Sequence, residues 1–253
     1  MTKLAGKSVL VIGASRGIGA ATALKLAAPG TALVLTTRAN SDGLENTAAA
    51  AREAGAATET ALFDLAETDS VEALVAQARA RFGRIDQIVC NAGRALKSQF
   101  GDFGRAEIAQ AMDINTLPFV ELVTATRADL EASNWGRVVA ISSFVTNDIG
   151  INGTIFPVTA ASKAALEALA KTLAFQLAPT GCTVNCVAPG YTRKIGGHAA
   201  LPPAAWEAAA RATPSGRIAE PSDIAAAVGF LLSREACHVT GQILRVDGGL
   251  SLL

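Results

Sequence analysis

Short apolar runs alternate along the whole chain with segments in which alanine and leucine recur at helical spacing. Several runs, such as 8–13 and 85–90, are continuously apolar, which is typical of parallel strands covered on both faces. Strands are predicted at 8–13, 32–37, 57–63, 85–90, 136–142, 182–188 and 241–247. Helices are predicted at 17–28, 43–54, 68–82, 104–131, 160–178 and 221–232.

This alternation predicts an α/β fold with a doubly wound, seven-stranded parallel sheet of the Rossmann type. The chain shows no linker and no low-complexity tract, so a single domain over 1–253 is expected. Right-handed crossovers place the carboxyl ends of all strands at one edge of the sheet, where ligands bind. Polar, glycine-bearing turns follow the strands, which places the expected functional site at this edge.

Charge and cysteine content exclude several other classes of protein. Lys plus Arg equals Asp plus Glu at 22 each, so no pull toward nucleic acid or an anionic membrane is expected. No run approaches the ~18 apolar residues of a membrane span. Cys182 and Cys186 lie in one predicted strand about 13 Å apart, too far for a disulfide. With no C-x-x-C pair, reduced thiols, a cytoplasmic location and no metal site are expected.

A glycine-rich turn between the first strand and the first helix is the strongest local signal. Gly13 allows a tight turn, Gly17 lets the backbone approach a diphosphate, and Gly19 permits close packing of helix on strand. The first N–H groups of the helix would face the phosphates. A glycine turn without a ligand is the alternative. The predicted dinucleotide-binding residues of this turn are Gly13, Ser15, Arg16, Gly17, Ile18 and Gly19.

The end of the second strand indicates which dinucleotide is bound. An acidic residue there would hold the ribose 2′-hydroxyl of NAD, whereas a basic residue suits a 2′-phosphate. This chain has Thr37 and Arg38 at that position, with Arg16 in the adjacent turn. Guanidinium groups match phosphate geometry, so NADP(H) is the predicted cofactor, although two solvated surface arginines would also fit the sequence.

The ordered set of motifs resembles the short-chain dehydrogenase/reductase family over essentially the whole chain. The set comprises G-x-x-x-G-x-G at 13–19, Asn-Ala-Gly at 91–93, serine in ISSF, lysine early in the next helix and Pro-Gly at 189–190. The stretch 215–249 is similar to the 3-oxoacyl-carrier-protein reductase branch. The resemblance implies cofactor contacts from Asp64, Leu65, Asn91, Ala92, Gly93, Lys163, Pro189, Gly190 and Thr192.

The resemblance also implies catalytic roles. Ser143 matches the serine that hydrogen-bonds the substrate carbonyl, and Asn115 matches the asparagine that holds a water in a proton relay. Lys163 matches the lysine that binds the nicotinamide ribose and lowers the pKa of a catalytic tyrosine. The alternatives are that Ser143 caps a loop, that Asn115 satisfies buried backbone groups, and that Lys163 pairs with Glu167 at i,i+4.

The chain departs from the family at the tyrosine. Counting back four residues from Lys163 reaches Thr159, and counting back seven reaches Phe156. A threonine hydroxyl is a far weaker acid than a phenol with a pKa of ~10, and it is shorter. Direct protonation of an alkoxide is therefore the step most damaged, and a water relayed through Asn115, Lys163 and Thr159 is expected to replace it.

Other groups are alternative donors. The segment between Ser143 and Thr159 is long for the family and carries Thr146, Asn147, Asp148 and Asn152. Asp148 is the first candidate among them, although a solvated loop aspartate is the favoured interpretation of that residue. The only tyrosine, Tyr191, would face the nicotinamide or pack beneath a lid.

Three expectations about function follow. The first is an NADP(H)-dependent oxidoreductase acting on an activated carbonyl or conjugated alkene, as in the family's 2,4-dienoyl-CoA reductases, which lack the tyrosine. The second is a non-redox enzyme such as an isomerase, dehydratase or cyclase, and the third is an impaired subunit. Residues 191–216 resemble the family's lid over an apolar pocket for a small-molecule substrate. The family also implies a homo-oligomer, either tetramer or dimer, built through 104–131 and 160–178.

Overall fold

The computed structural model describes residues 6–64, 70–150, 154–194 and 203–252 and contains one seven-stranded sheet. Every adjacent pair of strands is parallel, and the strand order is β3-β2-β1-β4-β5-β6-β7. The strands are β1 (Ser8–Ile12), β2 (Ala32–Thr37), β3 (Ala57–Leu62), β4 (Gln87–Cys90), β5 (Arg137–Ile141), β6 (Thr183–Pro189) and β7 (Ile243–Val246). This confirms the predicted single-domain, doubly wound parallel sheet.

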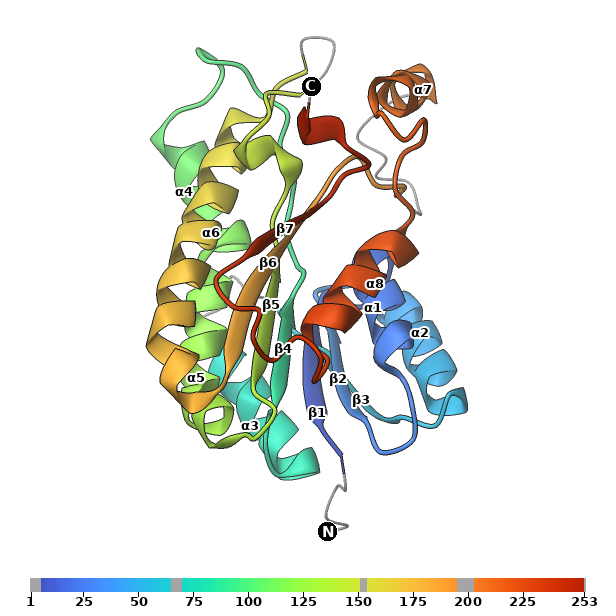
Figure 1. Cartoon of the computed structure of the whole chain (residues 1–253), viewed down its shortest axis with the longest axis vertical. Helices are drawn as coiled ribbons and strands as arrows, with labels where there is room; N and C mark the ends of the chain where they lie inside the picture. The colour runs from blue at the N-terminus through green and yellow to red at the C-terminus, as the bar shows by residue number, and fades with distance from the viewer. Residues whose placement is uncertain (1–5, 65–69, 151–153, 195–202, 253) are drawn as a thin grey trace.

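Helices cover both faces of the sheet (Figure 1). One layer contains α1 (Gly17–Leu26), α2 (Ser41–Glu53) and α8 (Pro221–Leu231). The other layer contains α3 (Ser70–Phe82), α4 (Arg105–Asn115), α5 (Leu117–Ala132) and α6 (Pro157–Leu177). The short helices are η1 (Phe144–Thr146), η2 (Ala178–Thr180), α7 (Pro203–Ala212) and η3 (Leu250–Leu252).

Two hydrophobic cores explain why the central strands are apolar at every position. In β1, Leu10 and Ile12 pack into the core beneath α3, α5 and α6, whereas Val9 and Val11 pack into the core beneath α1, α2 and α8. Successive strand side chains point to opposite faces, so a strand between two helical layers needs an apolar residue at each position.

The predicted helix at 104–131 is wrong in one respect, because the structure has two helices there. Thr116 ends α4 and precedes α5 with a non-helical backbone (φ −127°, ψ −54°). Pro118 follows in the first turn of α5, a position where the missing N–H of proline costs no helical hydrogen bond. The break leaves Asn115 as the last residue of α4, with its side chain turned toward the sheet edge.

The start of α6 and the lid also differ from the prediction. α6 begins at Pro157, three residues earlier than expected, so Thr159 lies in its first turn and Lys163 one turn later. The segment predicted to be a lid contains the helix α7, which the sequence did not indicate. Within the described residues, no helix combines the length and the apolar character required to cross a membrane.

Candidate active site

The glycine turn adopts the geometry that a nucleotide phosphate requires. Gly13 has a φ of +77°, and a Cβ on Gly19 would lie 2.1 Å from the Gly13 carbonyl oxygen. A side chain at Gly19 would therefore push α1 away from β1. Gly17 has open space beside it, and α1 has neither a side-chain cap at Arg16 nor an acidic residue in its first turn. The amino end of α1 thus fits a bound diphosphate.

The end of β2 contains hydroxyl groups and a cation where an NAD-binding protein has an acid. Thr37 Oγ1 donates to Ser15 Oγ at 3.0 Å, which joins β2 to the glycine turn. Arg16 and Arg38 are exposed on either side of this bond, and neither forms an ion pair with another described residue. Lys194 lies close to Arg16, because the charge of Arg16, after burial, lowers the pKa of Lys194. It adds a third basic side chain to this region. These groups fit a ribose 2′-phosphate.

The loop after β4 packs against the glycine turn. Asn91 Nδ2 donates to the Gly13 carbonyl at 2.9 Å, and Ala92 follows it at the same edge of the sheet. Asp64 lies just beyond β3, with its carbonyl accepting a hydrogen bond from Ser70 Oγ at 2.9 Å. Leu65, predicted with Asp64 to contact the adenine, lies outside the described residues.

Gly93, Asn115 and Lys163 converge from three separate elements. A Cβ on Gly93 would lie 2.9 Å from Asn115 Oδ1 and 3.0 Å from Lys163 Nζ. The loop after β4, the end of α4 and the second turn of α6 are therefore in direct contact. Glycine is needed at position 93 because any side chain would displace both polar groups.

Lys163 is buried and does not pair with Glu167 as a surface lysine would. Its side chain is 6% exposed, and Nζ donates to the Ile141 carbonyl at the end of β5, at 2.7 Å. Burial lowers the pKa of Lys163 to about 8, an effect that the charge of Glu167 partly opposes. A buried ammonium with an available N–H is suited to hold ribose hydroxyls.

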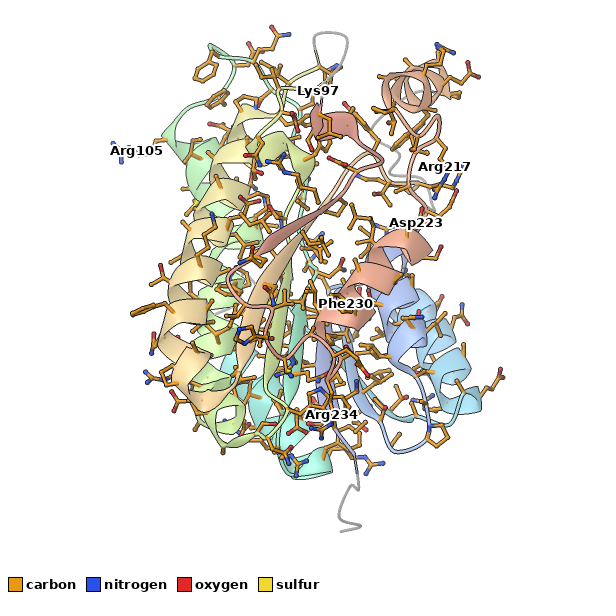
Figure 2. All side chains as sticks on the ribbon, in the orientation of Figure 1. Lys97, Arg105, Arg217, Asp223, Phe230 and Arg234 are labelled. Carbon is orange, nitrogen blue, oxygen red and sulfur yellow. The ribbon has the colours of Figure 1, made fainter. Side chains whose placement is uncertain are left out.

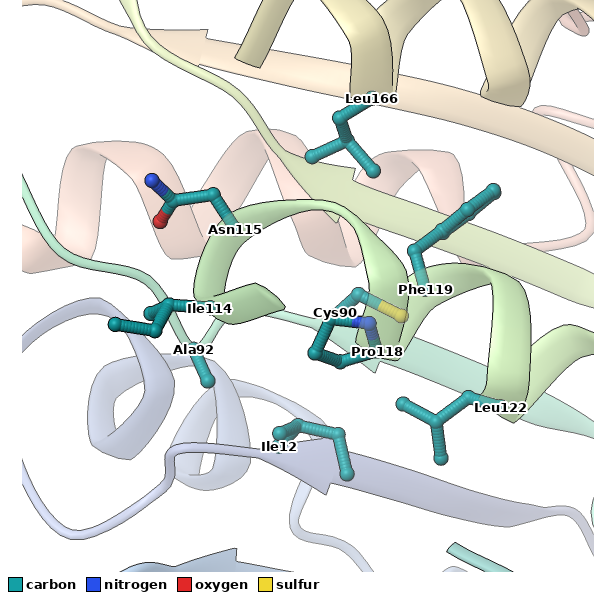
Figure 3. Close-up of a pocket in the computed structure, with 9 residues that line it drawn as sticks. All are labelled: Ile12, Cys90, Ala92, Ile114, Asn115, Pro118, Phe119, Leu122 and Leu166. Atoms are coloured by element: carbon teal, nitrogen blue, oxygen red, sulfur yellow. The ribbon is translucent and has the colours of Figure 1, made fainter. Parts of the chain in front are cut away.

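Asn115 is held by three hydrogen bonds. Oδ1 accepts from the Arg94 N–H at 2.8 Å, while Nδ2 donates to the Arg94 carbonyl at 3.1 Å and to Ser162 Oγ at 3.0 Å. Asn115 also borders a small cavity of about 10 Å³ between β4 and α5. The other lining residues, all apolar or thiol, are Ile12, Cys90, Ala92, Ile114, Pro118, Phe119, Leu122 and Leu166 (Figure 3). This volume is about that of one water molecule.

Ser143 sits at the turn between β5 and η1. Its Oγ accepts from the Val145 N–H at 3.4 Å, a long hydrogen bond that leaves the hydroxyl proton available to a substrate. The preceding Ser142 is 5% exposed and donates to the carboxylate of Glu167. The two adjacent serines thus have different surroundings, and Ser143 is the more exposed of them.

The Thr159 hydroxyl is occupied by the loop after β4. Its Oγ1 accepts from the Leu96 N–H at 2.8 Å and lies 3.4 Å from the Leu96 carbonyl oxygen. The side chain is only 3% exposed. The Thr159 side chain is thus a short hydroxyl held by the backbone of the loop after β4. Sequence reasoning did not identify Leu96 as the partner.

The segment after β6 forms the other wall of the site. Pro189 ends β6, the Gly190 N–H donates to the Val246 carbonyl at 3.1 Å, and Thr192 Oγ1 donates to the Gly190 carbonyl at 3.0 Å. Tyr191 is 7% exposed and packs on Phe144, with ring centroids 4.7 Å apart.

Beyond this segment, α7 borders an open pocket of about 500 Å³. Trp206, Ala210 and Ile218 supply apolar surface, whereas Arg193, Glu207, Glu220 and the Arg217–Asp223 ion pair (2.6 Å, Figure 2) make much of the lining charged. This volume lies within the range of small-molecule sites. Residues 195–202 of the predicted lid lie outside the described residues.

Of the alternative proton donors, Asp148 lies within the described residues. Asp148 is half-buried, and its N–H donates to the Phe144 carbonyl at 3.0 Å, which folds it back over η1. Asn152 lies outside the described residues. Among the residues that are described, no three His, Cys, Asp or Glu side chains gather as a metal site would require.

Comparisons with known proteins show what the whole chain is similar to. Residues 13–251 match the family model described as Enoyl-(Acyl carrier protein) reductase. The chain is 36% identical over 251 residues to 3beta-hydroxysteroid dehydrogenase 1 of Eggerthella lenta, covering 98% of this chain and 95% of that protein.

Two solved structures are also similar. The angucycline C-6 ketoreductase LanV with bound NADP has a TM-score of 0.90 at 28% identity, covering 99% of this chain and 98% of that one. A 7α-hydroxysteroid dehydrogenase with NADH and 7-oxo glycochenodeoxycholic acid has a TM-score of 0.89 at 29% identity, covering 98% and 95%. One neighbour binds NADP and the other NADH, so similarity alone does not choose between the two cofactors.

Proposed function

The chain belongs to the short-chain dehydrogenase/reductase family of nicotinamide-dependent oxidoreductases, and from this we propose an NADP(H)-dependent reductase with an atypical proton donor. Its substrate would be a small apolar molecule bearing an activated carbonyl or a conjugated alkene. The observation that carries the proposal is the Thr159 hydroxyl, which stands at the position of the family's phenol and is bonded to Leu96.

NADP(H) rather than NAD(H) is supported by the charges around the glycine turn. Arg16 and Arg38 flank the Ser15–Thr37 hydrogen bond, and no carboxylate ends β2. NADPH supplies the hydride when bound. The protein would hold its diphosphate at the amino end of α1, its adenosine between Asp64 and 91–93, and its nicotinamide half against Lys163 and 189–192.

On the substrate side, Ser143 would donate a hydrogen bond to the substrate oxygen as negative charge develops there. Lys163 would orient the ribose, and its ammonium would stabilise the same charge. Proton delivery would pass through water beside Asn115 and Lys163. Thr159 would contribute to that route only through its contact with the loop, because its hydroxyl already serves the Leu96 backbone.

Conjugated alkenes suit this arrangement better than simple ketones. Hydride transfer to a ketone produces an alkoxide that needs a positioned acid at once, a contribution of ~10²–10⁴-fold. Hydride transfer to the β-carbon of an enone produces an enolate, which needs hydrogen-bond stabilisation first and a proton later. The same missing acid supports a second candidate, an NADP-binding protein without net redox turnover, either a non-redox enzyme or a catalytically impaired subunit.

Matched substrates test the proposal. NADPH oxidation is measured with 2-cyclohexen-1-one, with cyclohexanone, and with larger pairs that also differ only in the alkene. We expect turnover of enones to saturated ketones, identified by mass spectrometry, and ketone reduction at least ~10²-fold slower. Tight NADPH binding without turnover of any substrate in the series would contradict the reductase proposal and favour the second candidate.

The association state and location are part of the same proposal. Leu117, Leu169 and Phe175 expose apolar side chains on α5 and α6, and Phe175 is 86% exposed. A homo-oligomer, tetramer or dimer, would cover them, and light scattering after size exclusion measures its mass. The cysteines of the described chain are unpaired, which fits a cytoplasmic protein. Fractionation of the native host checks that location.

A further inference from the structure

Glu167 is a buried carboxylate that the proposed reaction does not use. It lies on α6 one turn beyond Lys163, and its side chain is 7% exposed. Charged groups are rarely buried to this extent unless they have partners, because removing a carboxylate from water costs several kcal/mol. The position of those partners therefore indicates what the residue does.

The partners of Glu167 flank Ser143 on both sides. Glu167 Oε1 accepts a short hydrogen bond from Ser142 Oγ and a second, at 3.0 Å, from Thr146 Oγ1. Thr146 Oγ1 also lies 3.0 Å from the Ser143 carbonyl. One carboxylate oxygen thus joins the residue before Ser143 to the end of η1, three residues after it.

Glu167 forms no ion pair with another described residue. Lys163 is the buried cation nearest to it along α6, yet Lys163 Nζ donates to the Ile141 carbonyl. The described structure contains no Lys163–Glu167 contact within ion-pair distance. Lys163 and Glu167 instead bond to the same short segment, at residues 141, 142 and 146.

We propose that Glu167 is a positioning residue, which fixes the Ser143 hydroxyl toward the substrate by bridging Ser142 and Thr146. The catalytic part of this statement rests on the proposed function, since it takes Ser143 as the group that binds the substrate oxygen. The structural part does not depend on it. The Ser143 hydroxyl itself has only the long bond from the Val145 N–H, so without the Glu167 bridge it would rotate among several directions.

Two substitutions separate the hydrogen bonds from the charge. Glu167→Gln keeps an acceptor oxygen for Ser142 and Thr146, whereas Glu167→Leu removes it, and both remove the charge. We expect kcat for 2-cyclohexen-1-one, or for the best enone of the series, to fall ~10–100-fold in the leucine variant. In the glutamine variant we expect a fall of only about threefold. The Kd for NADPH should stay within about threefold of wild type in both, because Glu167 does not face the nucleotide.

A double-mutant cycle adds a readout that a general loss of stability would not move. In the Ser143→Ala background, Glu167→Leu should have little further effect on kcat, since the group it positions is absent. If the losses in kcat of the two single variants add in the double variant, Glu167 does not act through Ser143. Glu53→Gln, the same change as in the glutamine variant but at the exposed end of α2, is the control. If Glu167→Leu does not fold, Ser142→Ala combined with Thr146→Val removes the same bonds from the other side.

Hydrogen exchange decides the structural part without any substrate. The amides of Thr146, Asn147 and Asp148 bond to carbonyls within the turn. They should exchange at least ~10-fold faster in the leucine variant than in the glutamine variant or the wild type. Equal exchange in all three would overturn the proposal. A wild-type protein that neither binds NADPH nor reduces an enone would instead contradict the proposed function, leaving this exchange result to stand.

Discussion

The nucleotide half and the substrate half of the carboxyl edge are built in different ways. Around β1, β2 and β4, the site consists mainly of backbone: a glycine with positive φ, the free amino end of α1, and the Asn91 bond to the Gly13 carbonyl. Around β5, α6 and β6, it depends on individual side chains, namely Ser143, Thr159 and Lys163.

This difference determines what a single substitution can change. A backbone-built phosphate site tolerates many side-chain replacements, because its N–H groups and dipole remain. A site in which one phenol donates the proton loses that donor with one residue. The two halves therefore predict intact cofactor binding together with altered chemistry, and each prediction below probes one half.

The largest effect is expected from restoring a phenol. Thr159→Tyr places an acid of pKa ~10 beside the Lys163 ammonium, which stabilises the phenolate and so favours proton transfer near neutral pH. Cyclohexanone reduction should rise by ~10²–10⁴-fold, measured as NADPH oxidation with the alcohol quantified. Thr159→Phe is the control, since it adds the ring without the hydroxyl. Equal rates in the two variants would show that position 159 does not face the substrate oxygen.

The next effect tests the nucleotide half. Arg38→Ala removes a guanidinium from the end of β2, and hydrogen bonds to charged groups contribute about 1.5–3 kcal/mol. The Kd for NADPH should rise ~10–100-fold, while the Kd for NADH should change less than threefold, both read from nicotinamide fluorescence. Arg105→Ala, at the distant start of α4 (Figure 2), should leave both unchanged. An equal loss of affinity for NADPH and NADH would show that Arg38 does not contact the 2′-phosphate.

Burial of Lys163 predicts a pH-dependent stability. Its pKa is lowered to about 8 in the folded chain, so between pH 8 and 10.5 the unfolded chain binds more protons and stability rises with pH. Charges facing Lys163 include Glu167 on its own helix, while Cys90 and Cys186, with pKa values raised by burial to about 12, stay neutral. Relative to Lys163→Met, the wild type should gain about 2 kcal/mol from pH 7 to pH 9.5 in urea unfolding. If the difference in free energy of unfolding between wild type and Lys163→Met does not change with pH, the Lys163 ammonium is solvated in the folded chain.

Patterns local in sequence were sufficient for the fold and for the position of the glycine turn. The continuous apolar runs predicted the strands because both sheet faces are covered, and the spacing of the glycines predicted the turn at 13–19. The break at Thr116 was missed because apolar residues keep a helical spacing across Pro118, and proline is acceptable in the first turn of a new helix.

The polar contacts of the substrate half depend on pairings between distant residues. Thr159 meets Leu96 across 63 positions, and nothing in either local sequence indicates the other. Lys163 and Glu167 have the spacing of a helical ion pair, but each finds a partner on the segment after β5 instead. Tertiary contacts outweigh an i,i+4 pair worth only a few tenths of a kcal/mol.

The smallest predicted effect decides what the threonine does. Thr159→Val keeps the shape of the side chain but leaves the Leu96 N–H without its acceptor at 2.8 Å. The N–H is at a partly exposed loop, so the free energy of unfolding should fall by about 1 kcal/mol. Thr124→Val, at an exposed hydroxyl that bonds only within α5, should cost less. Enone turnover should change less than threefold if the hydroxyl is a tether, whereas a relay that passes through it would lose ~10²-fold or more in kcat. The free energy of unfolding and kcat of Thr159→Val, measured together, separate these two roles. Loss of a tether lowers stability, whereas loss of a relay lowers the rate.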